Sequence, residues 1–315
     1  MNNKNKIIII SGPTASGKTK TSVNLATKLG GEIINFDSLV FYKELTIGTA
    51  KPTQKEMNDI PHHLVGTHSI YSPLNAADFI KEAVPIINRI HERNKTVFLV
   101  GGSGFYLQAL LHGMYDSPTT SEKILNQSET LYLKQGITPF LKILKDEDLE
   151  SFERYHENDH YRIRRAVEHF WQTGQRFSTS RKKMQTDMNL TPIEKYEWDL
   201  FHLYLDIDKE EHFKIIQKRS QTMLKNGLIE EVRAILSKGA DGSEKPLNSI
   251  GYKETISYIR GDFPSIEAYL ERLNINTRRL AKSQRTWFKK VEKKSYNPLT
   301  DQDILLSDCN NFLEN

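Results

Sequence analysis

The residues best suited to chemistry stand near the start of the chain, in the segment GPTASGKT at positions 12–19. It fits the phosphate-loop pattern G-x-x-x-x-G-K-[ST] and directly follows an apolar run at 7–10. Glycines at both ends let the backbone wrap closely around an anion, and the helix expected at 20–29 adds the positive end of its dipole. Lys18 supplies a mobile charge, and the Thr19 hydroxyl can bind a Mg²⁺ ion that bridges the phosphates. The pattern predicts a phosphate site, for an unspecified phosphate compound, built from Gly12, Pro13, Thr14, Ala15, Ser16, Gly17, Lys18 and Thr19.

A carboxylate is expected beside this loop. Asp37 ends the next strand-like segment, 32–37, and the carboxyl ends of parallel strands face the ligand crevice of an open sheet. Asp37 could hold Mg²⁺, or it could act as a general base that accepts a proton from a group next to the phosphates. Spacing alone leaves both uses open.

Three further motifs are ambiguous by themselves. The third strand-like segment ends in a glycine turn at 101–104, where backbone amides could approach an anion or a base edge. The polar sequence GTAKPT at 48–53 is equally typical of a surface turn. Arg219 lies in a helical pattern, where arginines usually face water.

Positive charge is unevenly distributed along the chain. Residues 272–294 hold nine Lys or Arg against one acid, Glu292. Arg278, Lys282, Arg285 and Lys289 fall on one helical face. Such a face can simply be solvated, but this density favours a polyanionic partner. Around 161–183, basic and aromatic residues alternate, which suits an RNA backbone and unstacked bases.

The elements that must position these residues follow an α/β pattern. Strand-like segments at 6–11, 32–37, 96–102 and 199–207 alternate with helical segments. From about 115 to 198 the strand signals vanish and helical patterns take over. We therefore predict a P-loop NTPase-like parallel sheet core flanked by helices, with a mainly helical insertion. The core domain covers 1–114 and 199–295, the insertion 115–198, and a C-terminal tail 296–315.

Composition narrows the class of protein. The 315 residues carry a net charge of +4, an ordinary balance for a soluble protein. No apolar run approaches the roughly 18 residues of a membrane span, so we expect a cytoplasmic protein without a membrane partner. The single cysteine, Cys309, provides neither a disulfide framework nor a cysteine zinc site.

Taken together, the motifs resemble a known family. The segments GPTASGKT, FDSLVFYKELTIGTAKPT, HHLVG, LVGGSGFYLQALLHG, RIRRAVEHFWQTGQ, IGYKE and RRLAKSQRTWF occur in this order over residues 7–290. They are similar to those of the bacterial tRNA dimethylallyltransferases. The resemblance implies Mg²⁺-dependent transfer of a dimethylallyl group from dimethylallyl diphosphate to N6 of adenosine 37 in the tRNA anticodon loop, with release of diphosphate. It also implies that the phosphate loop holds the prenyl diphosphate rather than ATP, and that the protein is a monomer.

Roles carry over only to matching positions. Asp37 matches the family's catalytic aspartate, which favours the interpretation that it is a general base. Arg219 matches the family's diphosphate-contacting arginine. Thr19 would bind the metal. The segments that contact tRNA match Asp37, Ser38, Leu39, Val40, Ser103, Tyr161, Arg162, Ile163, Arg164, Arg165, Ser249, Ile250, Gly251 and Tyr252, and the basic face adds Arg278, Lys282 and Arg285. The chain departs from the family at His160-Tyr161, where proline and glutamine are usual, so a contact from that glutamine cannot be carried over.

Other functions remain open on sequence grounds. An adenylate isopentenyltransferase uses the same donor with a free nucleotide, but it does not need a long cationic surface. A phosphate-loop kinase or ATPase would use Asp37 to hold magnesium. An RNA-binding protein with a vestigial loop would not need to keep Lys18, Thr19 and Asp37 together.

Overall fold

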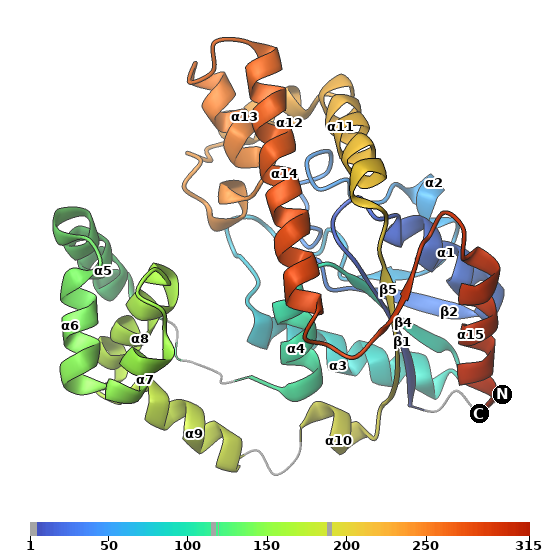
Figure 1. The fold of residues 1–315 in the computed structure, drawn as a ribbon, viewed down its shortest axis with the longest axis horizontal. Helices are drawn as coiled ribbons and strands as arrows, with labels where there is room; N and C mark the ends of the chain where they lie inside the picture. Colours follow the sequence, from blue (N-terminus) through green and yellow to red (C-terminus); the bar gives the residue numbers. More distant parts are fainter. Residues whose placement is uncertain (1–4, 115–117, 119, 188–190) are drawn as a thin grey trace. The chain divides into compact units, whose positions relative to one another are not determined.

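The computed structural model describes residues 5–114, 118, 120–187 and 191–315. The chain forms two compact units (Figure 1). Unit 1 consists of Met1–His112 and Pro192–Asn315, and unit 2 of Gly113–Thr191. None of the helices in the described ranges has the length and hydropathy that crossing a membrane requires.

Unit 1 is built on a parallel sheet with strand order β3-β2-β4-β1-β5-β6. The strands are β1 (Lys6–Ser11), β2 (Gly31–Asn35), β3 (His62–His63), β4 (Thr96–Gly101), β5 (Asp199–Leu205) and β6 (Lys294–Tyr296). Central β1 pairs Ile7 with Val97 of β4 and with Leu200 of β5. The four predicted strands are confirmed as β1, β2, β4 and β5. The short edge strands β3 and β6 were not predicted, because so few residues carry no periodic signal.

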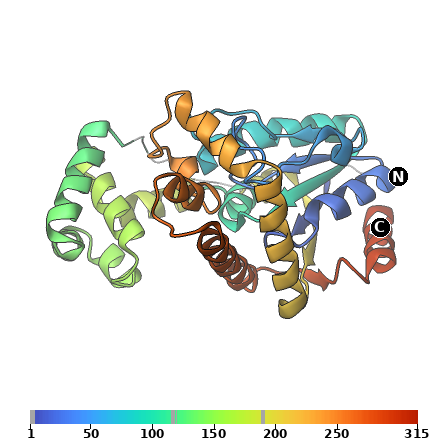
Figure 2. The same cartoon turned by 90° about the horizontal axis from the view of Figure 1, so that it is seen from above.

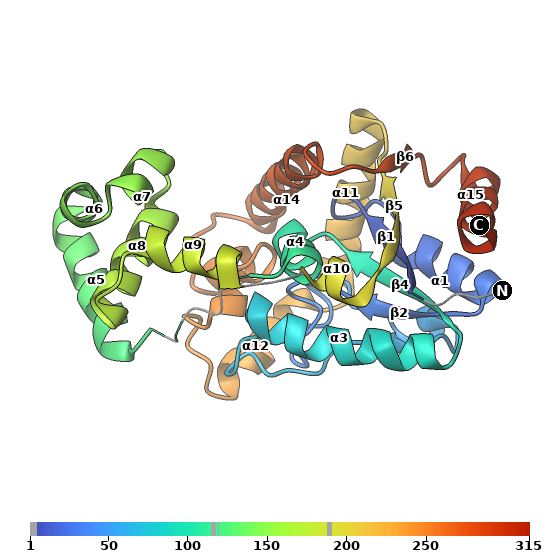
Figure 3. The same cartoon turned by 90° about the horizontal axis from the view of Figure 1, so that it is seen from below.

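Helices cover both faces of this sheet, which explains the uninterrupted isoleucine run of β1. The helices on its two faces are α1 (Lys18–Leu29), α3 (Ala76–Glu92), α4 (Gly104–His112) and α15 (Gln302–Glu314). Ile7 and Ile9 pack on the side of α3 and α4, whereas Ile8 and Ile10 pack on the side of α1 and α15. Figure 3 shows α3 and α1 on either side of the strands. Helix α15 lies in the predicted tail, and it buries Leu305 in the same cluster as Ile8.

The rest of unit 1 is helical and contains a second core. Its elements are α2 (Gln54–Met57), α10 (Pro192–Tyr196), α11 (Lys209–Lys225), α12 (Leu228–Ser237), the 3₁₀ helix η1 (Lys245–Asn248), α13 (Tyr252–Ile259) and α14 (Ile266–Phe288). Helices α11 and α14 lie side by side (Figure 2). Tyr42, Leu45, Leu228, Val232 and Tyr252 form this second core, which joins the loop after β2 to α12 and α13.

Unit 2 consists of helices in its described part. They are α5 (Glu122–Gln135), α6 (Thr138–Glu147), α7 (Leu149–Arg154), α8 (His160–Thr173) and α9 (Phe177–Asp187). Phe140, Leu144, Ile163, Ala166 and Val167 form its core. The insertion was predicted at 115–198, and its first residue lies outside the described ones. The predicted range also includes α10, which belongs to unit 1 and packs against α4.

Candidate functional site

The phosphate loop, residues 12–19, joins β1 to α1. A Cβ atom at Gly12 would lie 2.5 Å from the Leu205 carbonyl oxygen, so no larger residue fits there. Gly17 caps α1 with φ +83°. Ala15 also has a left-handed backbone, φ +63°, which is unfavourable for a residue with a Cβ. The loop is thus folded tightly at each end and strained in the middle.

Lys18 closes over its own loop. Its Nζ donates to the carbonyl oxygens of Gly12 at 3.0 Å and Pro13 at 2.8 Å. Burial lowers the pKa of Lys18 to about 8, with Asp37 working against the shift and Arg219 adding to it. A bound phosphate would favour the charged amine and offer it a stronger acceptor than a carbonyl.

The Ser16 hydroxyl lies in the same loop, fully buried. Among the described residues it has no hydrogen-bond partner. A buried hydroxyl without a partner costs free energy, and an anion in the loop could satisfy it.

Asp37 is held firmly just beyond β2. The Asn35 side chain accepts from the Asp37 backbone N–H at 2.9 Å and donates to the Asp37 and Leu64 carbonyl oxygens. One carboxylate oxygen of Asp37, Oδ1, accepts from the Leu39 N–H at 3.2 Å. Within the described part of the chain the other oxygen accepts no hydrogen bond, so it is available to a ligand.

One cavity of about 690 Å³ brings the predicted reactive groups together. The phosphate loop from Thr14 onward, Asp37 and Arg219 all line it. Arg219 comes from α11, and its Nη2 donates to the Thr49 carbonyl oxygen at 3.3 Å. Burial lowers the pKa of Arg219, and the nearby Asp37 opposes this shift. The cavity therefore offers two cations, backbone amides and a carboxylate within one space.

The GTAKPT segment forms a wall of this cavity rather than a plain surface turn. Thr49, Ala50 and Pro52 line it. The turn before them is fastened by Glu231 of α12, whose carboxylate accepts from the N–H groups of Thr46 at 3.1 Å, Ile47 at 2.7 Å and Gly48 at 3.3 Å.

Tyr252 completes this fastening. Its hydroxyl donates to Glu231 at 2.7 Å, and a Cβ at Gly48 would lie 2.6 Å from its ring. The cavity wall and the start of α13 are therefore joined through one carboxylate.

The glycine turn after β4 serves close packing. A Cβ at Gly102 would lie 2.5 Å from the Gln284 amide nitrogen, and one at Gly104 would lie 2.2 Å from the Trp287 ring. Ser103 Oγ accepts from the Ser38 N–H at 3.0 Å and donates to Ser38 Oγ at 3.2 Å. The turn thus brings α14 close to β4 and ties down the residue next to Asp37.

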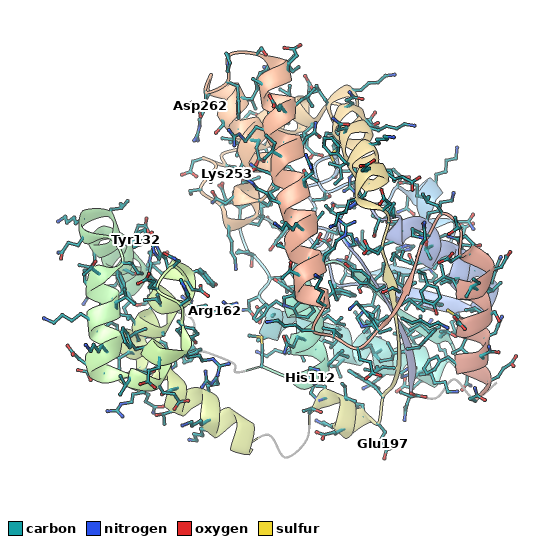
Figure 4. The ribbon with its side chains drawn as sticks, viewed as in Figure 1. His112, Tyr132, Arg162, Glu197, Lys253 and Asp262 are labelled. Atoms are coloured by element: carbon teal, nitrogen blue, oxygen red, sulfur yellow. The ribbon has the colours of Figure 1, made fainter. Side chains whose placement is uncertain are left out.

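The candidate RNA-contacting residues of unit 2 lie in the first turns of α8. Tyr161 is 71 % exposed, whereas Ile163 is buried in the core of the unit. Arg162, labelled with Tyr132 in Figure 4, forms an ion pair with Asp159. Tyr161 and Arg162 are therefore accessible, and the Ile163 side chain is not.

The next two arginines of α8 are engaged inside unit 2. Arg164 donates to Glu129 at 2.6 Å and stacks on the Tyr132 ring. Arg165 donates to Glu168 at 2.8 Å. A phosphate contact from either would compete with these bonds.

In unit 1 the candidate RNA-contacting residues differ widely in exposure. Ser249 and Ile250 are half-buried, while Gly251, with φ +100°, and Tyr252 are buried. Val40 is buried and lines the cavity. Leu39 is half-buried and does not line it.

The basic face of α14 is only partly exposed. Arg278 is exposed and stacks on the Phe213 ring at 4.1 Å, and Lys282 is exposed. Arg285 is 18 % exposed and forms an ion pair with Asp206 at 2.8 Å. The tRNA contact of Arg285 stays a prediction, and its guanidinium already has acceptors inside unit 1.

A divalent cation fits this site as a companion of phosphate. Groups of three or more His, Cys, Asp or Glu side chains that could hold a metal are absent from the described residues. Thr19 and Asp37 nevertheless line the same cavity. Mg²⁺ commonly takes one or two protein oxygens together with substrate phosphates and water, which matches this donor set.

Glu231, His212 and Gln284 were not predicted from the sequence. Each binds backbone of a loop far away in sequence: Gln284 accepts from the Thr14 N–H, and His212 Nε2 donates to the Thr14 carbonyl oxygen. Gln284 lies in the segment RRLAKSQRTWF, which resembles the family's, but the segment does not indicate which residue Gln284 binds.

Comparisons with known sequences agree on one family. The model of the family described as IPP transferase matches residues 40–291. A protein of Geotalea uraniireducens named tRNA dimethylallyltransferase 2 is 40 % identical over 287 residues, covering 91 % of this chain and 90 % of its own. The tRNA dimethylallyltransferase of Alkaliphilus oremlandii is 35 % identical over 312 residues, covering 99 % and 96 %.

Solved structures give the same result. The full-length tRNA isopentenylpyrophosphate transferase from Bacillus halodurans is 31 % identical, with a TM-score of 0.71, and the match covers 99 % of this chain and 97 % of that one. A eukaryotic dimethylallyltransferase described as acting on tRNA is 26 % identical, with a TM-score of 0.77, covering 97 % and 77 %.

Proposed function

Because the chain belongs to the IPP transferase family, we propose that it transfers a dimethylallyl group from dimethylallyl diphosphate to N6 of adenosine 37 in tRNA. The products are N6-(dimethylallyl)adenosine and diphosphate. The observation that carries the proposal is the single cavity in which Lys18, Asp37 and Arg219 meet.

The leaving group explains the cationic half of the cavity. As N6 bonds to the allylic carbon, the bond between that carbon and the diphosphate oxygen breaks, and negative charge grows on the diphosphate. Lys18, Arg219 and the amides of the phosphate loop supply preorganised positive charge and donors for it. The orphaned Ser16 hydroxyl gives one more donor.

Mg²⁺ would be held by Thr19 together with the diphosphate itself. When bound, it neutralises part of the phosphate charge as a Lewis acid. The family and the donor set support this assignment.

Asp37 supplies the base. The exocyclic amine of adenine is a weak nucleophile, so its proton must pass to an acceptor as the carbon–nitrogen bond forms. Asp37 Oδ1 is occupied by the Leu39 N–H, which orients the carboxylate and leaves the second oxygen for that proton. Asn35 fixes the backbone on both sides of the same residue.

The acceptor must leave its stack to reach such a cavity. Flipping a base out costs a few kcal/mol, which contacts to the RNA backbone and stacking must offset. We assign these contacts to the exposed Tyr161 and Arg162 of unit 2 and to Arg278 and Lys282 of α14. Unit 1 is then the catalytic core and unit 2 an RNA-contacting insertion.

The test is transfer of radiolabelled dimethylallyl diphosphate to an anticodon stem-loop that contains adenosine 37, beside free AMP. Label should enter the RNA only, and Asp37→Asn should lose at least 100-fold in rate, within the usual range for a general base. Asp303→Asn, an exposed aspartate on α15, is the matched control. Label in AMP alone would indicate an adenylate isopentenyltransferase, and hydrolysis of labelled ATP without transfer would indicate a kinase or ATPase.

A further inference from the structure

Two side chains hold the backbone of Thr14 from opposite sides. Gln284 Oε1 of α14 accepts from the Thr14 N–H at 2.8 Å, while its Nε2 donates to the Gly102 carbonyl oxygen at 3.1 Å. His212 Nε2 of α11 donates to the Thr14 carbonyl oxygen at 2.8 Å. Both backbone groups of one phosphate-loop residue are therefore bound by helices from the second half of the chain.

A third residue, Arg285, determines which ring nitrogen of His212 carries the proton. Its Nη2 lies 2.9 Å from His212 Nδ1. A guanidinium can only donate, so Nδ1 must accept, and the proton of the neutral ring must sit on Nε2, facing Thr14. Burial lowers the pKa of His212, and Arg285 contributes in the same direction, which keeps the ring neutral.

Arg285 is itself anchored at the end of β5. Its Nε donates to Asp206 Oδ1 at 2.8 Å, and its Nη2 donates to the Ile207 carbonyl oxygen at 3.0 Å. Gln284, His212 and Arg285 thus form one connected set, here called the Thr14 bracket. It ties the phosphate loop to β5, α11, α14 and the turn after β4.

The residue next to the bracket is the strained one. Ala15, with φ +63°, directly follows the carbonyl that His212 holds. Non-glycine residues keep such a conformation only when their surroundings impose it, and they concentrate at ligand sites. The bracket supplies that constraint.

We propose that Gln284, His212 and Arg285 are positioning residues for the diphosphate, which hold Ala15 in its left-handed conformation so that the phosphate loop is formed before the ligand arrives. The ligand's identity rests on the proposed function. Arg285 is then part of the internal support of the loop rather than a contact to RNA phosphates.

The main experiment uses Gln284→Ala, because Gln284 is half-buried and its loss leaves no buried charge. Titration calorimetry with inorganic pyrophosphate and Mg²⁺ should show about tenfold weaker binding than in the wild type, as expected from losing hydrogen bonds that shape the loop. The KM for the anticodon stem-loop should not change. Ser283→Ala, its exposed neighbour on α14, should bind pyrophosphate like the wild type.

Rescue by glycine separates loop positioning from general damage. Glycine adopts φ near +63° without the Cβ penalty. Ala15→Gly should therefore restore about fivefold in affinity when it is added to the Gln284→Ala chain, because glycine does not need the bracket to adopt that conformation. His212→Ala gives an independent route to the same weakening and the same rescue.

Several results would overturn the proposal. They are unchanged pyrophosphate binding in both Gln284→Ala and His212→Ala, a raised KM for RNA with normal pyrophosphate binding, or no rescue by Ala15→Gly. Thermal melting of each variant establishes that it is folded. Pyrophosphate binding is measured without transfer, so a wild type that binds it but prenylates no RNA refutes the proposed function and leaves the bracket standing.

Discussion

Removing the carboxylate of Glu231 should loosen the wall of the cavity and destabilise unit 1. Of its four donors, the Thr46 N–H is exposed and can bind water instead, and the Gly48 N–H is distant at 3.3 Å. The Ile47 N–H and the Tyr252 hydroxyl make the shorter bonds, both at 2.7 Å, and they are less accessible to water because Ile47 is half-buried and Tyr252 is buried. Leaving a buried donor unsatisfied costs about 1–3 kcal/mol, so Glu231→Ala should lower the free energy of unfolding by about 3 kcal/mol.

Urea denaturation measures this loss, with Glu230→Gln as the matched control because Glu230 is the exposed neighbour on α12. Glu231→Gln should fall between the two, since an amide oxygen can still accept from Ile47. The wall also positions the Thr49 carbonyl that holds Arg219, so the KM for dimethylallyl diphosphate should rise in Glu231→Ala. If Glu231→Ala were as stable as Glu230→Gln, the carboxylate would not be what fastens this turn.

Three further outcomes follow from contacts and charges elsewhere. Gly104→Ala would place a Cβ 2.2 Å from the Trp287 ring, so it should cost about 1–3 kcal/mol of stability; an unchanged melting temperature would contradict this. The pKa of Lys18 is lowered to about 8 by burial, so pyrophosphate affinity should weaken as the pH rises past 8 in the wild type but not in Lys18→Arg. At Glu32, hydrogen bonds from neighbours led by Arg93 outweigh burial and lower the pKa to about 2 from 4.5. The ionised Glu32 carboxylate therefore contributes its full stabilisation above pH 4.5, and this stabilisation is lost as the pH falls toward 2. When the free energy of unfolding is measured against pH, Glu32→Gln should not show this part of the loss of stability in acid.

The sheet and the gathering of the candidate reactive groups around one cavity were predictable because they depend on local signals. The isoleucine run of β1 indicates a buried strand within a few residues, and the glycines of the phosphate loop indicate a tight turn. The position of Asp37 followed from the rule that ligands bind at the carboxyl ends of parallel strands. These signals led to the residues that line the cavity.

Residues that act through a distant partner could not be predicted in this way. Gln284 looks like any polar helical residue until Thr14, 270 positions earlier, is placed beside it. Arg285 fits the spacing of an exposed basic face, and only Asp206 and Ile207 reveal that it points inward. The glycine turn at 101–104 left an anion or a base edge open as its partner from the sequence, and only the structure shows that Gly102 and Gly104 also allow α14 to approach closely.

The strand order has a consequence for how the protein is made on the ribosome. β1 is completed by β4 on one side and by β5 on the other, and the residues of unit 2 are synthesised between those two strands. A growing chain therefore exposes the open edge of β1 throughout the synthesis of unit 2, a state prone to mispairing. Even after β5 and α11 are made, the Thr14 N–H lacks its Gln284 partner until α14 is synthesised. Catalytic competence thus comes late in translation, although the phosphate loop is among the first segments made.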